Sequence, residues 1–271
     1  MPAINPARLR IQVTNLVEKF AMPKEFLADL HSIFDFYADR TLKPGRGGPR
    51  FANIKAYNVP AQVLRQIEGM LNLKIAEDFD MALMLADELW SQKWLECRLL
   101  ALSIIGQIPA SSPEPIIERI TAWGTECGID RQLDISLATG LIRLRKEAPN
   151  RFFQLVEGWL TSSKLTDRKL GLRIIPPLVN EPEFENLPAI FNLLSPIFEN
   201  SSKITDIDLI DALSSLVKRS PQETAYFLKQ SLAKSDRVGI DVLIRKVMND
   251  FPVQIREDLR AYFRQRRETL Q

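Results

Sequence analysis

Residues 143–160 read RLRKEAPNRFFQLVEGWL, and this stretch decides the fold because its pattern returns twice later in the chain. Residues 215–232, SLVKRSPQETAYFLKQSL, and residues 246–263, KVMNDFPVQIREDLRAYF, share its order of features. Each has a polar helix end carrying Lys or Arg, then a proline, then an amphipathic helix. Proline suits the first turn of a helix, where its missing N–H needs no partner. The three segments therefore predict a repeated helix–turn–helix unit.

The prolines that start these helices are regularly spaced. Pro113 and Pro149 lie 36 residues apart, Pro221 lies 72 beyond Pro149, and Pro252 follows after 31. The missing member of the series falls near Glu185, between two further prolines. Apolar residues recur at helical spacing almost everywhere else, with no convincing alternating stretch. This periodicity predicts an all-α fold of about fourteen helices, arranged as a right-handed superhelix of HEAT-like antiparallel helix pairs, an α-solenoid.

The same regularity predicts one helical-repeat domain over residues 1–271. An N-terminal helical pair is expected over 1–40, a basic loop rich in glycine and proline over 41–58, and HEAT-like repeats over 59–271. Short turns holding Asp-Arg recur between repeats, at 130–131, 167–168 and 236–237. An aspartate in the first turn of a helix is expected to cap exposed N–H groups.

Several classes of function find no support in the residues. The stretch with Gly45, Gly47 and Gly48 lacks the Lys-Ser/Thr of a phosphate-binding loop. His31 is the one histidine, and its helical neighbours indicate a structural role, so we expect neither a catalytic triad nor a metal site. Cys97 and Cys127, 30 residues apart, are expected to be reduced, half-buried thiols. No signal peptide, membrane span or cofactor motif is recognised, and we expect a cytoplasmic protein.

Charge is unevenly distributed along a chain whose net charge is +2. Residues 1–60 carry 9 Lys/Arg and 5 Asp/Glu, residues 61–214 carry 15 and 22, and residues 215–271 carry 12 and 7. The net charges are +4, −7 and +5. Basic side chains along a curved helical surface would track a phosphate backbone, whereas an acidic middle favours a protein partner. Both interpretations stay open from composition alone. Among the tryptophans, Trp90 and Trp159 are expected in the core, and Trp123, at a helix end beside Gly124, to face a groove.

Four segments resemble the AlkD-type DNA alkylation repair glycosylase family. Residues 87–108, DELWSQKWLECRLLALSIIGQI, resemble a family helix end and the helix after it, and residues 54–67, IKAYNVPAQVLRQI, resemble the family's proline-bearing entry segment. Residues 120–130, ITAWGTECGID, lie where the family has a Trp-Asp-x-x-Asp helix, and residues 165–175, LTDRKLGLRII, resemble its W-x-x-R-x-A helix. The resemblance spans about 50–270 and is strongest from 85 to 175. It implies HEAT-like repeats that bind double-stranded DNA and release cationic alkylated purines.

The resemblance also implies roles for single residues. Trp123 matches a tryptophan that contacts the sugar of the lesion, and Arg168 matches an arginine that holds a nearby phosphate. The carboxylate that the family has four residues after the tryptophan is Cys127 here, which cannot supply a fixed negative charge. Asp130 or Asp134, farther along the chain, could substitute. A second family tryptophan, expected near Val242, is absent.

Three functions follow as hypotheses. The first is an AlkD-like protein that binds duplex DNA in a concave basic groove, either as a glycosylase for N3- or N7-alkylpurines or as a non-catalytic relative. The second is a HEAT-repeat scaffold for protein partners, and the third an active glycosylase using Asp130 or Asp134. The expected catalytic residues are Trp123 and Asp130, with no metal or cofactor. The expected DNA-binding residues are Arg168, Lys169, Arg173, Arg131, Arg237 and Arg245.

Overall fold

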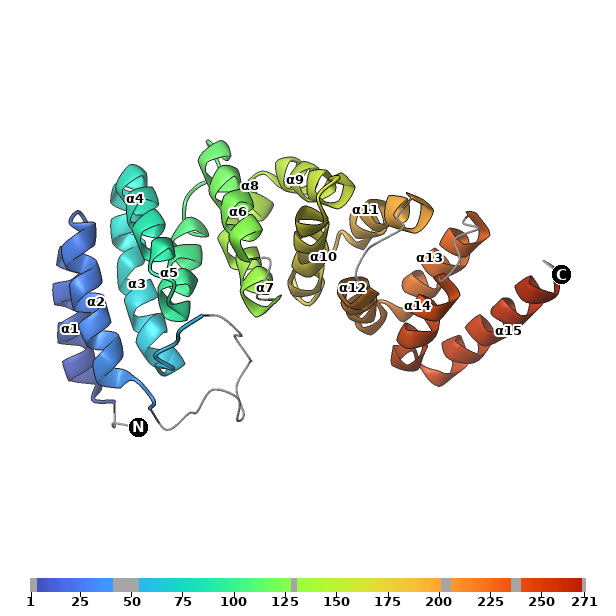
Figure 1. The fold of residues 1–271 in the computed structure, drawn as a ribbon, viewed down its shortest axis with the longest axis horizontal. Coiled ribbons are helices and arrows are strands. Elements are labelled where there is room, and N and C mark those ends of the chain that lie inside the picture. Colours follow the sequence, from blue (N-terminus) through green and yellow to red (C-terminus); the bar gives the residue numbers. More distant parts are fainter. Residues whose placement is uncertain (1–3, 41–53, 128–130, 201–205, 235–239, 270–271) are drawn as a thin grey trace. The chain divides into compact units, whose positions relative to one another are not determined.

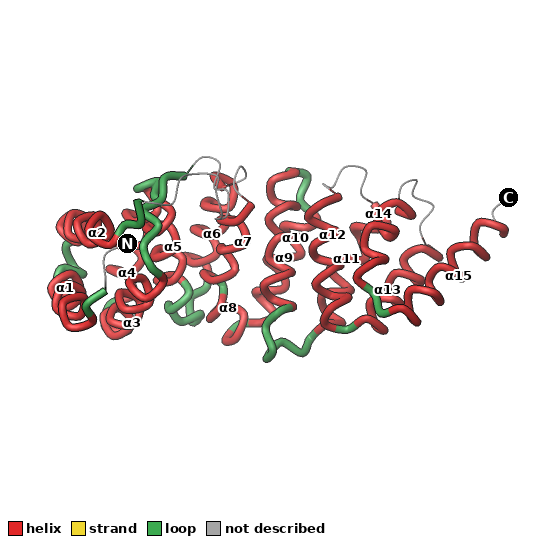
Figure 2. Tube along the Cα trace, turned by 90° about the horizontal axis from the view of Figure 1, so that it is seen from below, coloured by secondary structure: helices red, strands yellow, loops and turns green. Residues whose placement is uncertain are grey.

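The computed structural model describes residues 4–40, 54–127, 131–200, 206–234 and 240–269. Within these ranges the chain forms fifteen α-helices and one short 3₁₀ helix (Figure 1). Helices and loops account for all of this part of the chain, apart from an isolated bridge between Lys55 and Trp94 (Figure 2). The prediction of an all-helical solenoid is confirmed, with one helix more than expected. The HEAT-type assignment and the handedness stay predictions.

The chain divides into two compact units, residues 1–152 and 153–271. Unit 1 contains α1 (Pro6–Glu18), α2 (Pro23–Tyr37), α3 (Ala61–Glu77), α4 (Phe79–Ser91), α5 (Leu95–Ile105), α6 (Glu114–Cys127), α7 (Arg131–Gly140) and α8 (Ile142–Glu147). Helices α1, α3, α5 and α7 pack in sequence as one layer, and α2 packs on α4 in a second layer. Each layer buries the apolar stripe of the other, as a helical stack requires. The expectation of a single domain stays a prediction.

Unit 2 repeats this arrangement. The boundary between the units falls inside α9 (Pro149–Thr161), which is followed by α10 (Leu165–Val179), α11 (Leu187–Asn200), α12 (Asp206–Arg219), α13 (Pro221–Lys234), α14 (Ile240–Val247), η1 (Met248–Asp250) and α15 (Val253–Thr269). Helices α10, α12 and α14 form one layer, and α11, α13 and α15 form the other.

The proline punctuation lies where the sequence predicts it. Helices α9 and α13 begin at Pro149 and Pro221, and α6 and α15 begin one residue after Pro113 and Pro252. The missing member of the series appears as α11, which begins at Leu187. The sequence predicts that the aspartates of the Asp-Arg turns cap helices, but the one that the structure describes, Asp167, does not. Asp167 lies in the first turn of α10 but accepts a hydrogen bond from Ser162 Oγ at 2.7 Å, and no side chain caps that helix.

A buried carboxylate ties the segment before α3 to the stack. Glu96, in the first turn of α5, is 3% exposed and accepts hydrogen bonds from the backbone N–H groups of Tyr57 at 3.1 Å and Asn58 at 2.7 Å. The Tyr57 ring stacks on Trp94 with ring centroids 4.0 Å apart. Backbone N–H groups without a helical partner are thus satisfied by a side chain from the next repeat. This part of the predicted loop, from residue 54 onward, is therefore anchored; residues 41–53 lie outside the described ranges.

One close approach between helices tests the packing of unit 1. Gly106 ends α5, and a Cβ atom there would overlap the carbonyl oxygen of Thr139 in α7. We therefore expect Gly106→Ala to lower the free energy of unfolding by about 2 kcal/mol, because α5 and α7 would have to separate. Urea unfolding followed by tryptophan fluorescence measures this.

The matched control is Gly69→Ala in α3, where a Cβ meets nothing within 4 Å. Alanine is the better helix former, so this substitution should leave stability unchanged or raise it by up to about 1 kcal/mol. Equal effects of the two substitutions would contradict the close approach of α5 to α7.

Candidate functional site

Two tryptophans on neighbouring helices of unit 1 form the centre of the candidate site. Trp90 is in the last turn of α4 and Trp123 in the C-terminal half of α6, and their rings stack with centroids 4.4 Å apart and planes 6° from parallel. Both side chains are buried, at 4% and 5% exposure. The backbones of these two helices make few close approaches, so the paired indoles fill the space between them. Burial of two such surfaces gives a large apolar contribution in addition to their ring–ring attraction.

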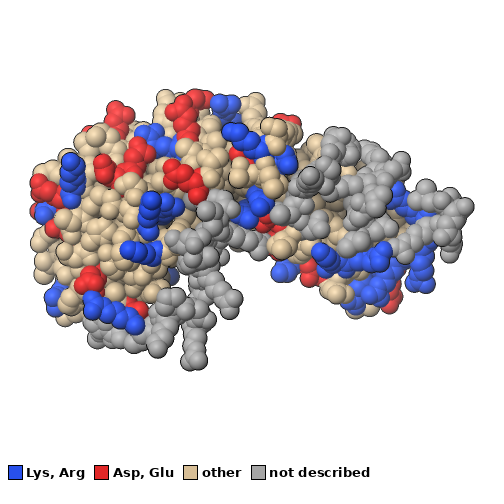
Figure 3. Space-filling view, viewed as in Figure 1, with Lys and Arg blue, Asp and Glu red and all other residues tan. Residues whose placement is uncertain are grey.

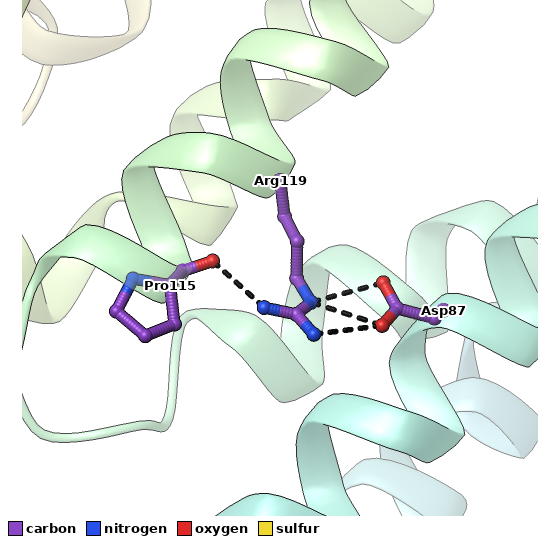
Figure 4. Close-up of polar contacts among 3 residues, drawn as sticks. All are labelled: Asp87, Pro115 and Arg119. Atoms are coloured by element: carbon purple, nitrogen blue, oxygen red, sulfur yellow. Dashed lines mark hydrogen bonds and ion pairs between the residues drawn. The ribbon is translucent and has the colours of Figure 1, made fainter.

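An arginine fork fixes the same two helices one turn earlier. Arg119 of α6 donates to both oxygens of Asp87 in α4, with Nε–Oδ1 at 2.9 Å and Nη2–Oδ2 at 2.8 Å (Figure 4). Its Nη1 donates to the carbonyl oxygen of Pro115 at 3.0 Å, which holds the guanidinium on its own helix. Two parallel N–H···O bonds define both distance and orientation. The fork therefore helps to set the register in which Trp90 meets Trp123.

A carboxylate is held beside the stacked pair. The indole Nε1 of Trp90 donates a hydrogen bond to Glu126 Oε2 at 3.0 Å. Glu126 follows Trp123 by three residues and so lies on the same face of α6. Its residue is exposed, whereas both indoles are buried. The arrangement presents an oriented carboxylate at the surface over an aromatic floor.

A guanidinium completes the cluster from α5. The Cζ atom of Arg98 lies 4.6 Å from the centroid of the Trp90 ring, and the Arg98 residue is only 8% exposed. A cation at this distance over an indole is attracted by the ring. The cluster, defined here as Trp90, Trp123, Arg98 and Glu126, therefore combines a flat aromatic pair with one group of each charge.

Trp90 and Trp159 lie in the core as expected, but the expectation that Trp123 faces a groove is wrong, because stacking on Trp90 buries it. Its catalytic role stays a prediction. Asp130 and Arg237 lie outside the described residues. Arg131 begins α7 and Asp134 lies within it, but the side chains of both are outside the described part. Glu126 was not recognised from the sequence, although its i+3 spacing from Trp123 was a usable signal.

Two of the expected DNA-binding residues lie together at the start of α10 in unit 2. Arg168 is half-buried, and its Nη1 donates to the carbonyl oxygen of Ser162 at 2.6 Å. Its Nε atom is buried without a hydrogen-bond partner. Lys169 follows and is also half-buried. A helix N-terminus carries partial positive charge, which these two side chains reinforce.

Arg173 lies one turn farther along α10 and has a structural role. Its Nε donates to Asp208 Oδ1 of α12 at 3.0 Å, and the two side chains are 10% and 3% exposed. This ion pair joins α10 to α12 inside unit 2. Arg245, by contrast, is exposed in the last turn of α14, where a positive charge also suits the helix dipole.

Charge on the surface follows the uneven distribution in the sequence. On the face in Figure 3, acidic and basic side chains are interspersed over unit 1, whereas within unit 2 basic side chains gather over the C-terminal helices. Several arginines of the acidic middle are engaged with carboxylates on neighbouring helices, Arg119 with Asp87 and Arg151 with Glu114 among them.

The other potentially reactive side chains that the structure describes have structural roles. His31 Nδ1 lies 2.9 Å from the hydroxyl of Tyr57, in agreement with the structural role expected for this histidine. Cys97 is fully buried, and burial raises the pKa of its thiol to about 12. A thiol with that pKa is almost wholly protonated near neutral pH and therefore inert. No group of three His, Cys, Asp or Glu side chains that could hold a metal ion occurs within the described ranges. No helix in those ranges is long and apolar enough to span a membrane.

A family model for DNA alkylation repair enzymes matches residues 40–240, which is most of the chain. The chain belongs to this family. The match includes α3 to α13 and with them the Trp90–Trp123 cluster and the start of α10. Searches of curated proteins and of solved structures give no significant match. The family supports a role in DNA alkylation repair.

The buried ion pair of unit 2 gives a test of the structural role of Arg173. Asp208→Ala should lower the free energy of unfolding by about 3 kcal/mol, because the charge of Arg173 would lose a buried partner. Asp258→Ala, on the exposed surface of α15, should change it by less than about 0.5 kcal/mol. Guanidinium unfolding followed by far-ultraviolet circular dichroism measures both. A stability unchanged by Asp208→Ala would contradict this role.

Proposed function

We propose that this DNA alkylation repair protein binds double-stranded DNA and releases cationic N3- or N7-alkylpurines from it, with Glu126 as the carboxylate of the reaction. The observation that carries the proposal is the hydrogen bond from Trp90 Nε1 to Glu126 Oε2, which orients a carboxylate at the edge of the stacked indoles. Family membership supports alkylated DNA as the substrate, and the N3- or N7-alkylpurine is part of the proposal. In this proposal Trp123 stacks on Trp90 and so forms part of the aromatic surface beside Glu126.

The chemistry requires little more than a fixed negative charge and water. Alkylation at N3 or N7 leaves the purine positively charged, so the C1′–N bond breaks with its electron pair passing to the base. Positive charge then develops on the sugar as an oxocarbenium-like species, which a nearby carboxylate stabilises. Water adds to C1′ and loses a proton, which leaves an abasic site and a neutral free base. Glu126 would stabilise the sugar and orient that water.

Arg168 and Lys169 are proposed to hold a DNA phosphate. Both residues are partly exposed near the start of α10, where the helix N-terminus adds positive charge, and this placement supports the role. Because Arg173 is paired with Asp208, we do not assign it a phosphate contact. The proposal keeps three further basic side chains that the sequence predicts to contact the DNA backbone: Arg131, Arg237 and Arg245. It also keeps Asp130 as an alternative carboxylate.

Glu126→Gln tests the catalytic proposal. The amide oxygen can still accept from Trp90, but the charge is lost, so release of 7-methylguanine from a methylated duplex should fall by about 100-fold or more. Duplex affinity should stay within about two-fold, because no phosphate contact changes. Single-turnover release and fluorescence anisotropy measure the two quantities.

The control is Glu118→Gln, an exposed glutamate two turns earlier on α6, which should leave release unchanged. Full release by the Glu126→Gln variant would overturn the role of Glu126 and direct attention to Asp130 and Asp134. No release by folded wild-type protein that still binds DNA would identify a non-catalytic binder.

Arg168→Ala tests the phosphate contact. Loss of one such contact should weaken duplex binding by about ten-fold and reduce the slope of log K against log salt by about 1. Arg151→Ala removes a positive charge already paired with Glu114, so it should change affinity by less than about two-fold. Equal affinities for wild type and Arg168→Ala across a salt series would remove Arg168 from the interface.

A scaffold for protein partners is the second candidate. The net charge of −7 over residues 61–214 favours it, together with the engagement of Arg119 and Arg173 by carboxylates. An absence of salt-dependent duplex binding by wild-type protein would favour this candidate over the first.

A further inference from the structure

A groove runs between α11 and α13 in unit 2, in the layer opposite α10, α12 and α14. It encloses about 610 Å³, which is within the size range of ligand sites. Among the expected DNA-binding residues whose side chains are described, Arg168, Lys169, Arg173 and Arg245, none lines it. The lining residues are Pro188, Phe191, Asn192, Ser195, Gln222, Glu223, Tyr226, Phe227, Gln230 and Ser231.

The dimensions of the groove favour an extended chain as its occupant. Its residues on α11 span Pro188 to Ser195, about 10 Å of helix, and those on α13 span Gln222 to Ser231, about 14 Å. The two helices pack on each other, with Phe191 and Phe227 ring centroids 5.0 Å apart. A groove of this length would hold only about two turns of a helix. An extended segment of three or four residues matches this length at about 3.1 Å per residue.

The walls combine aromatic surface with amide groups. Tyr226 is 64% exposed, and its hydroxyl accepts a hydrogen bond from Gln230 Nε2 at 2.6 Å, which helps to fix the ring over the groove. The buried Phe227 lies beneath, and Pro188 lies near the N-terminal end of α11. Asn192 and Gln222 each offer a donor and an acceptor. Aromatic walls with nearby hydrogen-bond donors suit a polyproline II chain, whose backbone carbonyls have no internal partners.

Negative charge at one end of the groove favours an extended ligand that carries a positive charge. Among the described residues that line the groove, Glu223 is the charged one, and it lies in the first turn of α13. Exposed Glu185 lies three residues before Pro188, in a loop held by hydrogen bonds from Arg219 Nη2 to the carbonyl oxygens of Pro182 and Phe184. Glu223, which lines the groove, attracts a cation at this end.

We propose that the α11–α13 groove binds a proline-containing extended peptide segment of a partner protein, with a lysine or arginine of that segment beside Glu223. The prolines pack against Tyr226 and Phe191, and the side-chain amides meet the peptide carbonyls. This surface is separate from the residues assigned to alkylated DNA, so a repair protein could be recruited to a partner through it.

Fluorescence anisotropy with labelled ten-residue peptides tests the proposal on the full-length protein. The first peptide has two prolines in PxxP spacing and an arginine at one end, the second has alanine in place of the arginine, and the third has alanine in place of both prolines. The first should bind saturably, and the other two more weakly. Tyr226→Ala should weaken binding of the first about ten-fold or more, as expected for an exposed aromatic anchor.

Glu223→Gln tests whether the arginine of the peptide lies beside Glu223. It should weaken the arginine peptide several-fold and leave the peptide without arginine unchanged. Phe36→Ala removes a partly exposed aromatic side chain of unit 1 and should not affect binding. Circular dichroism verifies that each variant is folded, and alkylpurine release should be unchanged in Tyr226→Ala.

Three outcomes would overturn the proposal. One is no binding of the first peptide at millimolar protein concentration. Another is equal binding of all three peptides to wild type and Tyr226→Ala. The third is binding of an oligothymidine probe, or of an amphipathic helical peptide, that is lost in Tyr226→Ala while the proline peptide does not compete.

Discussion

The stack of Trp90 on Trp123 is the contact on which the candidate site depends. Because α4 and α6 approach each other mainly through their side chains, the distance between them is set by what lies in the gap. Two indoles with parallel planes fill it, and the Arg119–Asp87 fork fixes the register one turn earlier. Glu126 is oriented only because the Trp90 indole N–H is in a defined place. A change in the stack would therefore move the carboxylate without touching it.

The arginines of the acidic middle explain how a weakly basic protein can have a mixed surface. Arg119, Arg151 and Arg173 each pair with a carboxylate on another helix, so their charge contributes to packing between repeats. The proposed DNA surface would then depend on basic side chains that packing engages less, such as Lys169 near the start of α10 and the exposed Arg245 of α14. Local geometry, more than net charge, decides which side chains can meet a phosphate.

Much of the fold could be predicted from the sequence, because proline at a helix start and apolar spacing are local properties. Pro149 and Pro221 begin helices in the structure for the reason inferred from sequence alone. The candidate site was harder to predict from the sequence. Whether Trp123 faces solvent depends on Trp90, 33 residues earlier, and whether Arg173 is available depends on Asp208, 35 residues later. These partners lie about one repeat away, and intrahelical spacing carries no information about them.

The same principle accounts for the contrast between the two surfaces described here. Successive helices of one layer must be bridged by side chains, and the size of those side chains decides whether the gap closes. Between α4 and α6, two tryptophans and the Arg119–Asp87 fork close it, and the Glu126 carboxylate lies beside the indoles. Between α11 and α13, the tilted rings of Phe191 and Phe227 lie with their centroids 5.0 Å apart, and a groove remains. The side chains between neighbouring helices of a repeat fold thus decide whether the gap is filled, as between α4 and α6, or stays open as a groove, as between α11 and α13.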